Sequence, residues 1–139
     1  MLGWELPPHN SGGLGVACYQ LCKALSEQVT SIDFLVPYQA DHGIDFMNVV
    51  GAMPYEVGAN GSFFPGGVYD SGEYRLENNE LARFQNAFTE ASVQIVKDGD
   101  YDIIHAHDWL TLQAGTAAQE HTGKPLIAHM HSVESDRSG

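Results

Sequence analysis

The sequence predicts an α/β domain, a parallel sheet with helices on its faces. Short apolar runs that are typical of buried strands alternate with longer segments whose apolar residues recur every three or four positions. Strands that alternate with helices are joined by right-handed crossovers and therefore pair in parallel. A glycine-rich turn between the first strand and the first helix lies where such sheets bind ligands.

Four elements are expected in the N-terminal half. Residues 2–6 read as the end of a short strand that enters the loop PPHNSGG. An apolar stripe then predicts a helix from 14 to 29, and it comprises Leu14, Cys18, Leu21, Cys22, Leu25 and Val29. Residues 32–36, closed by Pro37, and residues 47–50 are short enough to be buried strands. Because the two cysteines belong to the helical stripe, we interpret them as small core residues rather than a metal or redox pair.

The C-terminal half begins with a long loop at 51–74, rich in glycine and without a regular period, which is typical of a functional or partly disordered segment. A helix follows and ends near Lys97; its apolar stripe comprises Leu81, Phe84, Phe88, Ala91 and Ile95. Next are a strand at 102–107, a helix at 110–122 that ends at Gly123, and a strand at 124–132.

Composition excludes several classes of partner. The 139 residues are the length of one domain, and the net charge of −12 argues against nucleic acid or an anionic membrane, which both require clustered positive charge. No apolar run is long enough to span a bilayer, and the N-terminus lacks the features of a signal peptide. We therefore expect a cytoplasmic protein. Because the first strand is short and few residues follow the last, we expect the chain to be part of a longer protein.

The turn Gly12-Gly13-Leu14-Gly15 opens the first helix. Glycine lets a backbone approach a ligand closely, and the free amides and dipole of a helix N-terminus favour an anion such as a diphosphate. The turn is not a Walker loop, because no Lys-Ser/Thr follows it, and Cys18 stands where a dinucleotide fingerprint has a third small residue. A tight turn without a ligand explains the spacing equally well.

Two histidine pairs, His105 with His107 and His129 with His131, lie on neighbouring predicted strands. With a period of two, each pair projects to one face of the sheet. Zinc is one interpretation, with the nearby carboxylates Asp108, Glu134 and Asp136. An imidazole that binds sugar or phosphate is another. Buried, hydrogen-bonded histidines are the third, especially for His105 and His129.

Together these motifs resemble a known family. WELPPHNSGGLGVACYQLCKAL resembles the opening of glycogen synthase-like glycosyltransferases, retaining enzymes built from two Rossmann-like domains in the GT-B fold. DIIHAHDWLTLQAG and KPLIAHMHSVESDRSG resemble two further segments of that family, in the same order. The resemblance covers roughly two-thirds of the chain, whereas residues 38–76 match poorly.

The resemblance implies a role for each motif. Gly12 and Gly13 would approach the diphosphate of a nucleotide-sugar donor, such as an ADP-, UDP- or GDP-sugar. His107 would hydrogen-bond the transferred sugar, and Asp108 would fix that corner of the cleft. The residues expected to line the cleft nearer the acceptor are His131, Glu134, Asp136 and Arg137. No metal and no other cofactor is expected.

The resemblance also implies that residues 1–139 form a single N-terminal, acceptor-side, Rossmann-like domain, inactive without a C-terminal, donor-binding domain that lies outside these residues. The acceptor would be a glucan or another carbohydrate. Two alternatives stay open: a metal-dependent hydrolase that uses His105, His107, His129 and His131, and a non-catalytic module that binds carbohydrate or nucleotide.

Overall fold

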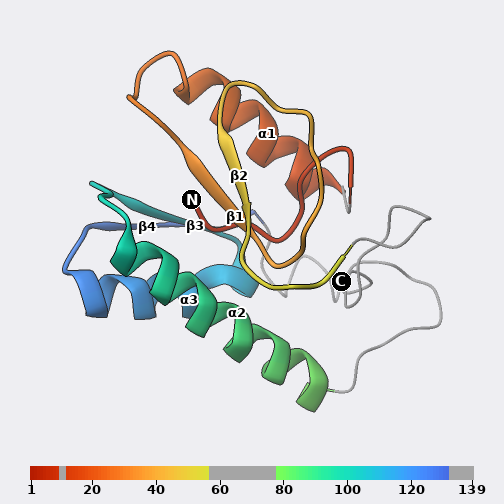
Figure 1. Ribbon diagram of the computed structural model, residues 1–139, viewed down its shortest axis with the longest axis vertical. Coiled ribbons are helices and arrows are strands. Elements are labelled where there is room, and N and C mark those ends of the chain that lie inside the picture. The colour runs from red at the N-terminus through yellow and green to blue at the C-terminus, as the bar shows by residue number, and fades with distance from the viewer. Residues whose placement is uncertain (10–11, 57–77, 132–139) are drawn as a thin grey trace.

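The computed structural model describes residues 1–9, 12–56 and 78–131, and these form an α/β fold (Figure 1). The elements in chain order are α1 (Gly13–Leu25), β1 (Asp33–Val36), β2 (Asn48–Gly51), α2 (Asn78–Asp98), β3 (Ile104–His107), α3 (Trp109–Thr122) and β4 (Leu126–His129).

The sheet is parallel and is held together at its centre by the N-terminal segment. β1 pairs with β2, and β3 pairs with β4. Leu2 forms parallel bridges to both Leu35 of β1 and Ala106 of β3. The Leu2 amide donates to the His105 carbonyl at 2.8 Å, and the Gly3 amide donates to the Leu35 carbonyl at 2.9 Å. The spatial order is therefore β2, β1, the N-terminal segment, β3 and β4.

The strand predicted at 2–6 is shorter in the structure than expected. Ladder pairing is confined to isolated bridges, and Leu6 instead forms an antiparallel bridge to His9. The chain turns back there at Pro7 and Pro8, which are joined by a cis peptide bond. His42 holds the turn, because its Nδ1 lies 2.9 Å from the Pro7 carbonyl oxygen.

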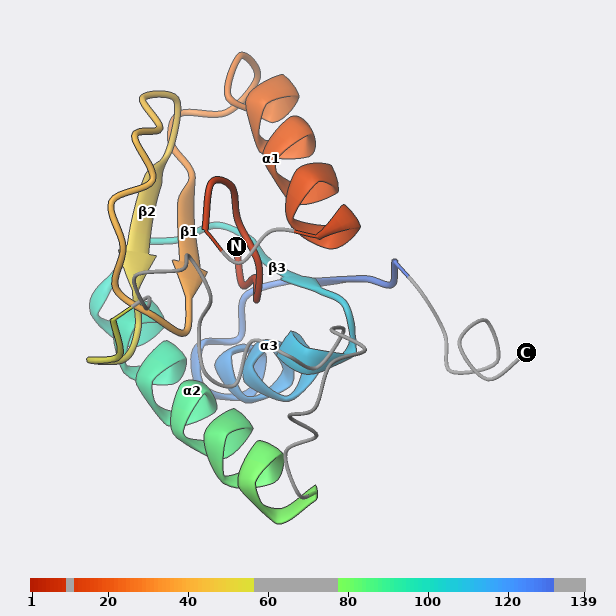
Figure 2. The same ribbon diagram turned by 90° about the vertical axis from the view of Figure 1, so that its right-hand side faces the viewer.

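Helices cover both faces of the sheet (Figure 2). α1 lies on one face, whereas α2 and α3 pack together on the other. Successive side chains of β1 point to opposite faces of the sheet and so enter two different cores. Leu35 belongs to the core under α2 and α3, whereas Phe34 and Val36 belong to the core under α1. Cys18 and Cys22 are free thiols buried in the α1 core, which confirms that they are small core residues.

Several predicted boundaries differ from those observed. α1 ends at Leu25 rather than at residue 29, and Val29 is 44% exposed, so the apolar stripe continues beyond the helix without packing on the core. The helix at α3 ends as predicted, with Gly123 in the left-handed conformation at φ 69°. Of the predicted 51–74 loop, residues 57–74 lie outside the described residues.

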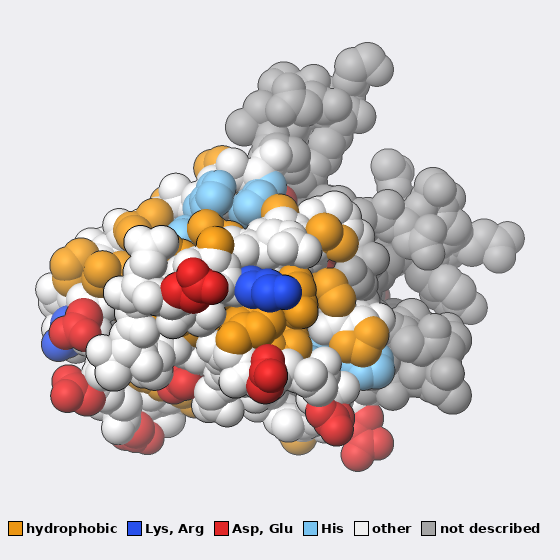
Figure 3. All heavy atoms as spheres, turned by 90° about the horizontal axis from the view of Figure 1, so that it is seen from above, with side chains coloured by type: hydrophobic (Ala, Val, Ile, Leu, Met, Phe, Trp, Pro, Cys, Tyr) orange, Lys and Arg blue, Asp and Glu red, His pale blue; other side chains and the backbone are white. Residues whose placement is uncertain are grey.

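The surface agrees with the strongly acidic composition. Figure 3 shows acidic side chains dispersed over one face and a few histidines gathered beside the part of the surface that is not described. Within the described ranges, no helix has the length and apolar character needed to cross a membrane.

Gly115 brings α3 into direct contact with the sheet. A Cβ atom at this position would lie 2.8 Å from Ala106 Cβ and 3.0 Å from Leu126 Cδ1, closer than carbon atoms approach. Only glycine therefore allows α3 to pack this closely against β3 and β4, the two strands that carry the histidines.

We predict that Gly115→Ala lowers the free energy of unfolding by about 1–3 kcal/mol, the usual cost of overpacking a core. Urea denaturation measures this change. Gly13→Ala is the matched control, because a Cβ there meets nothing within 4 Å in the structure. Equal stability of the two variants would contradict the close packing of α3 on the sheet.

Candidate functional site

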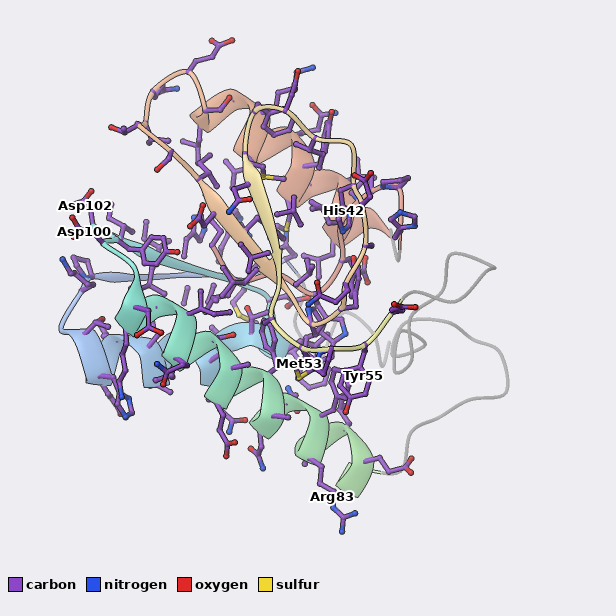
Figure 4. The ribbon with its side chains drawn as sticks, in the orientation of Figure 1. His42, Met53, Tyr55, Arg83, Asp100 and Asp102 are labelled. Atoms are coloured by element: carbon purple, nitrogen blue, oxygen red, sulfur yellow. The ribbon has the colours of Figure 1, made fainter. Side chains whose placement is uncertain are left out.

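The candidate site lies at the carboxyl ends of the strands. In Figure 4, Asp100 and Asp102, which precede β3, lie at one end of the sheet, whereas His42 and Tyr55, which follow β1 and β2, lie at the other. The glycine turn and the residues that follow β3 belong to this second end. Arg83 points away from the body of the protein on α2. This end of the sheet is where open α/β folds bind ligands.

The N-terminus of α1 is capped by a carboxylate of the chain itself. Glu5 Oε2 accepts a hydrogen bond from the Gly12 amide at 2.8 Å and a longer one from the Gly15 amide at 3.4 Å. Glu5 is only 5% exposed. Binding of a ligand anion here stays a prediction, and Glu5, whose carboxylate lies at this helix end, is not among the residues predicted from the sequence.

The three glycines of the turn have different surroundings. A Cβ at Gly15 would meet the Glu5 side chain and backbone within 3.1–3.2 Å, so this glycine lets α1 approach the N-terminal segment. A Cβ at Gly12 would lie 3.0 Å from Glu5 Oε2, whereas one at Gly13 would meet nothing within 4 Å. Of the turn residues that the structure describes, Gly13 thus offers the most open approach to a ligand.

Glu5 also connects the turn to the end of β3. Burial raises the pKa of its carboxyl, the Gly12 and Gly15 amides lower it, and the charge of Asp108 raises it. Asp108 directly follows β3, so the glycine turn and the histidine strand are close enough to interact electrostatically.

The histidines lie on the α1 face of the sheet. Along β3, Ile104 and Ala106 enter the core under α2 and α3, which leaves His105 and His107 on the opposite face. His107 is in register with His129 of β4. The ring centroids of His105 and His107 lie 4.2 Å apart, and those of His129 and His131 lie 4.3 Å apart. The prediction that the two histidines of each pair project to one face is confirmed.

The histidine cluster comprises His105, His107, His129 and His131, and His107 lies next to each of the other three. It is fully buried, its ring stacks on Phe34, and its Nδ1 lies within hydrogen-bonding distance of His131 Nε2 at 3.2 Å. Its Nε2 is buried and has no hydrogen-bond partner among the described residues, and the same is true of His105 Nε2. Buried polar atoms are normally paired, so both nitrogens are suited to a ligand.

Burial keeps these imidazoles neutral. Desolvation, followed by the neighbouring histidines, lowers the pKa of His107 to about 2 and the pKa of His105 to about 4. The pKa of His131 is lowered in the same way, with Asp108 opposing the change. At neutral pH His105 and His107 are therefore uncharged and can both donate and accept hydrogen bonds, as sugar hydroxyls require.

Asp108 occupies a strained backbone position. Its φ of 64° and ψ of 171° fall in a region that is essentially restricted to glycine. The side chain caps α3 by accepting from the Trp109 amide at 3.0 Å, and the Asp108 amide donates to the His129 carbonyl at 2.8 Å. Strain of this kind is common at functional sites, where the surrounding structure holds it in place.

The remaining predicted residues are only partly described. His131 is half-buried and contacts His107. Glu134, Asp136 and Arg137 lie outside the described residues. Phe34 is also absent from the predicted site, because an apolar strand residue gives no sign of the ring on which it will stack. Glu5 had a detectable signal, since it is a carboxylate shortly before a glycine turn.

We predict that acid destabilises the protein through His107. The unfolded chain binds a proton at this residue below its ordinary pKa of 6.5, whereas the native state resists protonation down to about pH 2. Unfolding therefore takes up a proton in this window, and the stabilisation present above pH 6.5 is lost as the pH falls. At pH 5 the loss from His107 is about 2 kcal/mol.

Urea denaturation at pH 7 and pH 5 measures this loss. His107→Gln removes the titrating group and should flatten the dependence on pH, while His121→Gln, at an exposed residue of α3, should leave it as in the wild type. An unchanged pH dependence in His107→Gln would contradict the burial of a neutral imidazole.

Two variants of Asp108 separate the effect of its side-chain cap on α3 from the effect of its backbone strain. Asp108→Ala removes the α3 cap and keeps the backbone strain, so it should lower the free energy of unfolding by about 1–2 kcal/mol. Asp108→Gly also removes the cap but relieves strain of about 1–3 kcal/mol, so it should be more stable than Asp108→Ala. Thermal unfolding compares the two variants, and a less stable glycine variant would contradict the strained conformation.

Comparisons with known proteins identify the family of the chain. A family model described as the starch synthase catalytic domain matches residues 1–138. The chain is 28% identical over 127 residues to a D-inositol 3-phosphate glycosyltransferase from Nocardiopsis dassonvillei, covering 89% of the chain and 27% of that protein.

Two further relatives span nearly the whole chain. An uncharacterized glycosyltransferase from Methanocaldococcus jannaschii is 28% identical over 140 residues, covering 100% of the chain and 32% of that protein. A glycogen synthase from Mycobacterium tuberculosis is 26% identical over 145 residues, covering 99% of the chain and 34% of that protein. The chain thus spans about a quarter to a third of the length of these relatives. The match to the family model over almost every residue shows that the chain belongs to the starch synthase catalytic domain family of glycosyltransferases.

Proposed function

We propose that the chain forms the N-terminal, acceptor-side domain of a glycosyltransferase that moves a sugar from a nucleotide-sugar donor, with retention, to a glucan or another carbohydrate. Family membership and the glycosyltransferase names of the relatives support the reaction class. The observation that carries the proposal is the buried, neutral His107, whose unpartnered Nε2 lies in a histidine cluster at the carboxyl end of the sheet.

In this proposal His107 hydrogen-bonds a hydroxyl of the transferred sugar. A neutral imidazole suits the task, because it accepts or donates without attracting a counter-ion into the site. His131 holds the His107 ring through the 3.2 Å contact between their nitrogens. Asp108 acts through its position, since its cap on α3 fixes the turn that follows His107.

The donor diphosphate approaches the turn at Gly13, where the backbone is open. Preorganised donors that stabilise a leaving diphosphate lower the barrier to this kind of transfer. Gly12 contributes indirectly, because its amide already donates to Glu5. Because the chain has only six Lys and Arg, we assign the positively charged residues that bind the nucleotide to a C-terminal domain outside these residues. We therefore expect the chain to be inactive by itself.

The acceptor side is assigned to His131 together with Glu134, Asp136 and Arg137, which follow β4 in sequence. The donor is an ADP-, UDP- or GDP-sugar, and no metal or other cofactor is assigned to the transfer step. The lack of a membrane-spanning helix in the described part of the chain is compatible with a cytoplasmic location.

We predict that His107→Ala in the full-length protein lowers kcat/KM for sugar transfer at least about tenfold, the cost of one hydrogen bond worth about 1.4 kcal/mol. Transfer from ADP-, UDP- and GDP-glucose to maltooligosaccharides provides the assay. His121→Ala, an exposed histidine on α3, is the matched control and should transfer sugar at the wild-type rate. Intact transfer by a folded His107→Ala protein would remove His107 from the donor site.

A further inference from the structure

The histidine cluster contains a second arrangement that sugar transfer does not use. His105 and His107 of β3 and His129 of β4 each offer a ring nitrogen, and these three atoms lie within 4.8 Å of one another. The centroid of the His105 ring lies 5.5 Å from that of His129, and the centroid of His107 lies 5.4 Å from it. We propose that these three residues bind a transition-metal ion of the zinc class.

The unpartnered nitrogens favour a ligand at this position. Nε2 of His105 and Nε2 of His107 are both buried and make no hydrogen bond to any described residue. A sugar bound at the end of β3 accounts for His107, but His105 lies two residues deeper in the strand. A metal ion held between the strands satisfies both nitrogens together.

A competing set of ligands is less suitable. Cys18, His107 and His131 also place three donor atoms within 4.8 Å. That set requires a thiolate, and burial raises the pKa of Cys18 to about 12. It also includes the two histidines that already contact each other through Nδ1 and Nε2. The set of three imidazoles needs no deprotonation, since neutral histidine binds a metal without losing a proton, and it leaves the contact between His107 and His131 in place.

The chemistry of the donors selects the ion. Three imidazoles suit Zn²⁺, Co²⁺, Ni²⁺ or Cu²⁺, whereas Mg²⁺ and Ca²⁺ prefer oxygen ligands. Zinc–nitrogen bonds of about 2.0–2.1 Å place tetrahedral ligand atoms about 3.3 Å apart, so the rings must turn and close around the ion. The half-buried His129, on the outermost described strand, is the least constrained of the three.

This site has a consequence for activity that rests on the proposed function. His107 belongs to both the proposed sugar site and the proposed metal site. An ion bound to its ring nitrogen therefore prevents that nitrogen from hydrogen-bonding the sugar. Zinc should therefore inhibit transfer, and a chelator should restore it. The binding itself does not depend on the proposed function, so the two ideas are tested by separate measurements.

Co²⁺ is the probe for binding. The full-length protein, freed of metal by a chelator, is titrated with Co²⁺ while the visible absorption bands of a tetrahedral ion are recorded, and Zn²⁺ is then added to displace it. We expect one Co²⁺ per chain and at least a tenfold loss of affinity in His105→Gln and in His129→Gln. Cys18→Ser, His131→Ala and His121→Ala should retain wild-type affinity.

Thermal unfolding with and without Zn²⁺ provides a measurement independent of the spectrum. Zinc should raise the Tm of the wild type and of His131→Ala, but not that of His129→Gln, because only a ligand that binds the native state stabilises it. The proposal is overturned by absent tetrahedral bands in the wild type, by unchanged affinity in the His105 and His129 variants, or by a loss confined to the Cys18 and His131 variants. None of these results bears on whether His107→Ala transfers sugar.

Discussion

The site depends on the pairing of the N-terminal segment between β1 and β3. The Leu2 amide donates to the His105 carbonyl, and the His107 amide donates in return to the Leu2 carbonyl at 3.0 Å. On the other side, the Leu35 amide donates to the Met1 carbonyl and its own carbonyl accepts from Gly3. Without these bonds the two strand pairs would not form one sheet. The same bonds bring Glu5 and the glycine turn beside the histidine strand.

A second constraint is the period of two along β3. Ile104 and Ala106 enter the core under α2 and α3, where Gly115 allows α3 to approach closely. The alternate residues, His105 and His107, are thereby placed on the opposite face, where His107 stacks on Phe34 and lies near Cys18. Burying two imidazoles there costs free energy, which the apolar packing of the strand must offset. The result is a pair of neutral imidazoles whose Nε2 atoms make no hydrogen bond to any described residue.

Both sides of the site thus contain a carboxylate that is buried from solvent. Glu5 places a buried carboxylate at the N-terminus of α1, and Asp108 places another at the N-terminus of α3. Glu5 accepts from the Gly12 and Gly15 amides and Asp108 from the Trp109 amide, and each lies where the helix dipole favours negative charge. The open approach at Gly13 therefore lies at a helix end already occupied in part by Glu5, while burial keeps His105 and His107 uncharged.

The sequence by itself determined the α/β class, the parallel pairing, the helix end at Gly123 and the shared face of the two histidines within each pair. These features follow from local periodicity and turn chemistry, which each segment carries alone. The tertiary structure decided the rest. It reduced the strand at 2–6 to isolated bridges, gave the Gly12 amide to Glu5 and brought His107 against Phe34 and His131. These outcomes rest on contacts between residues distant in sequence, and no local pattern specifies which side chain will meet which across a sheet.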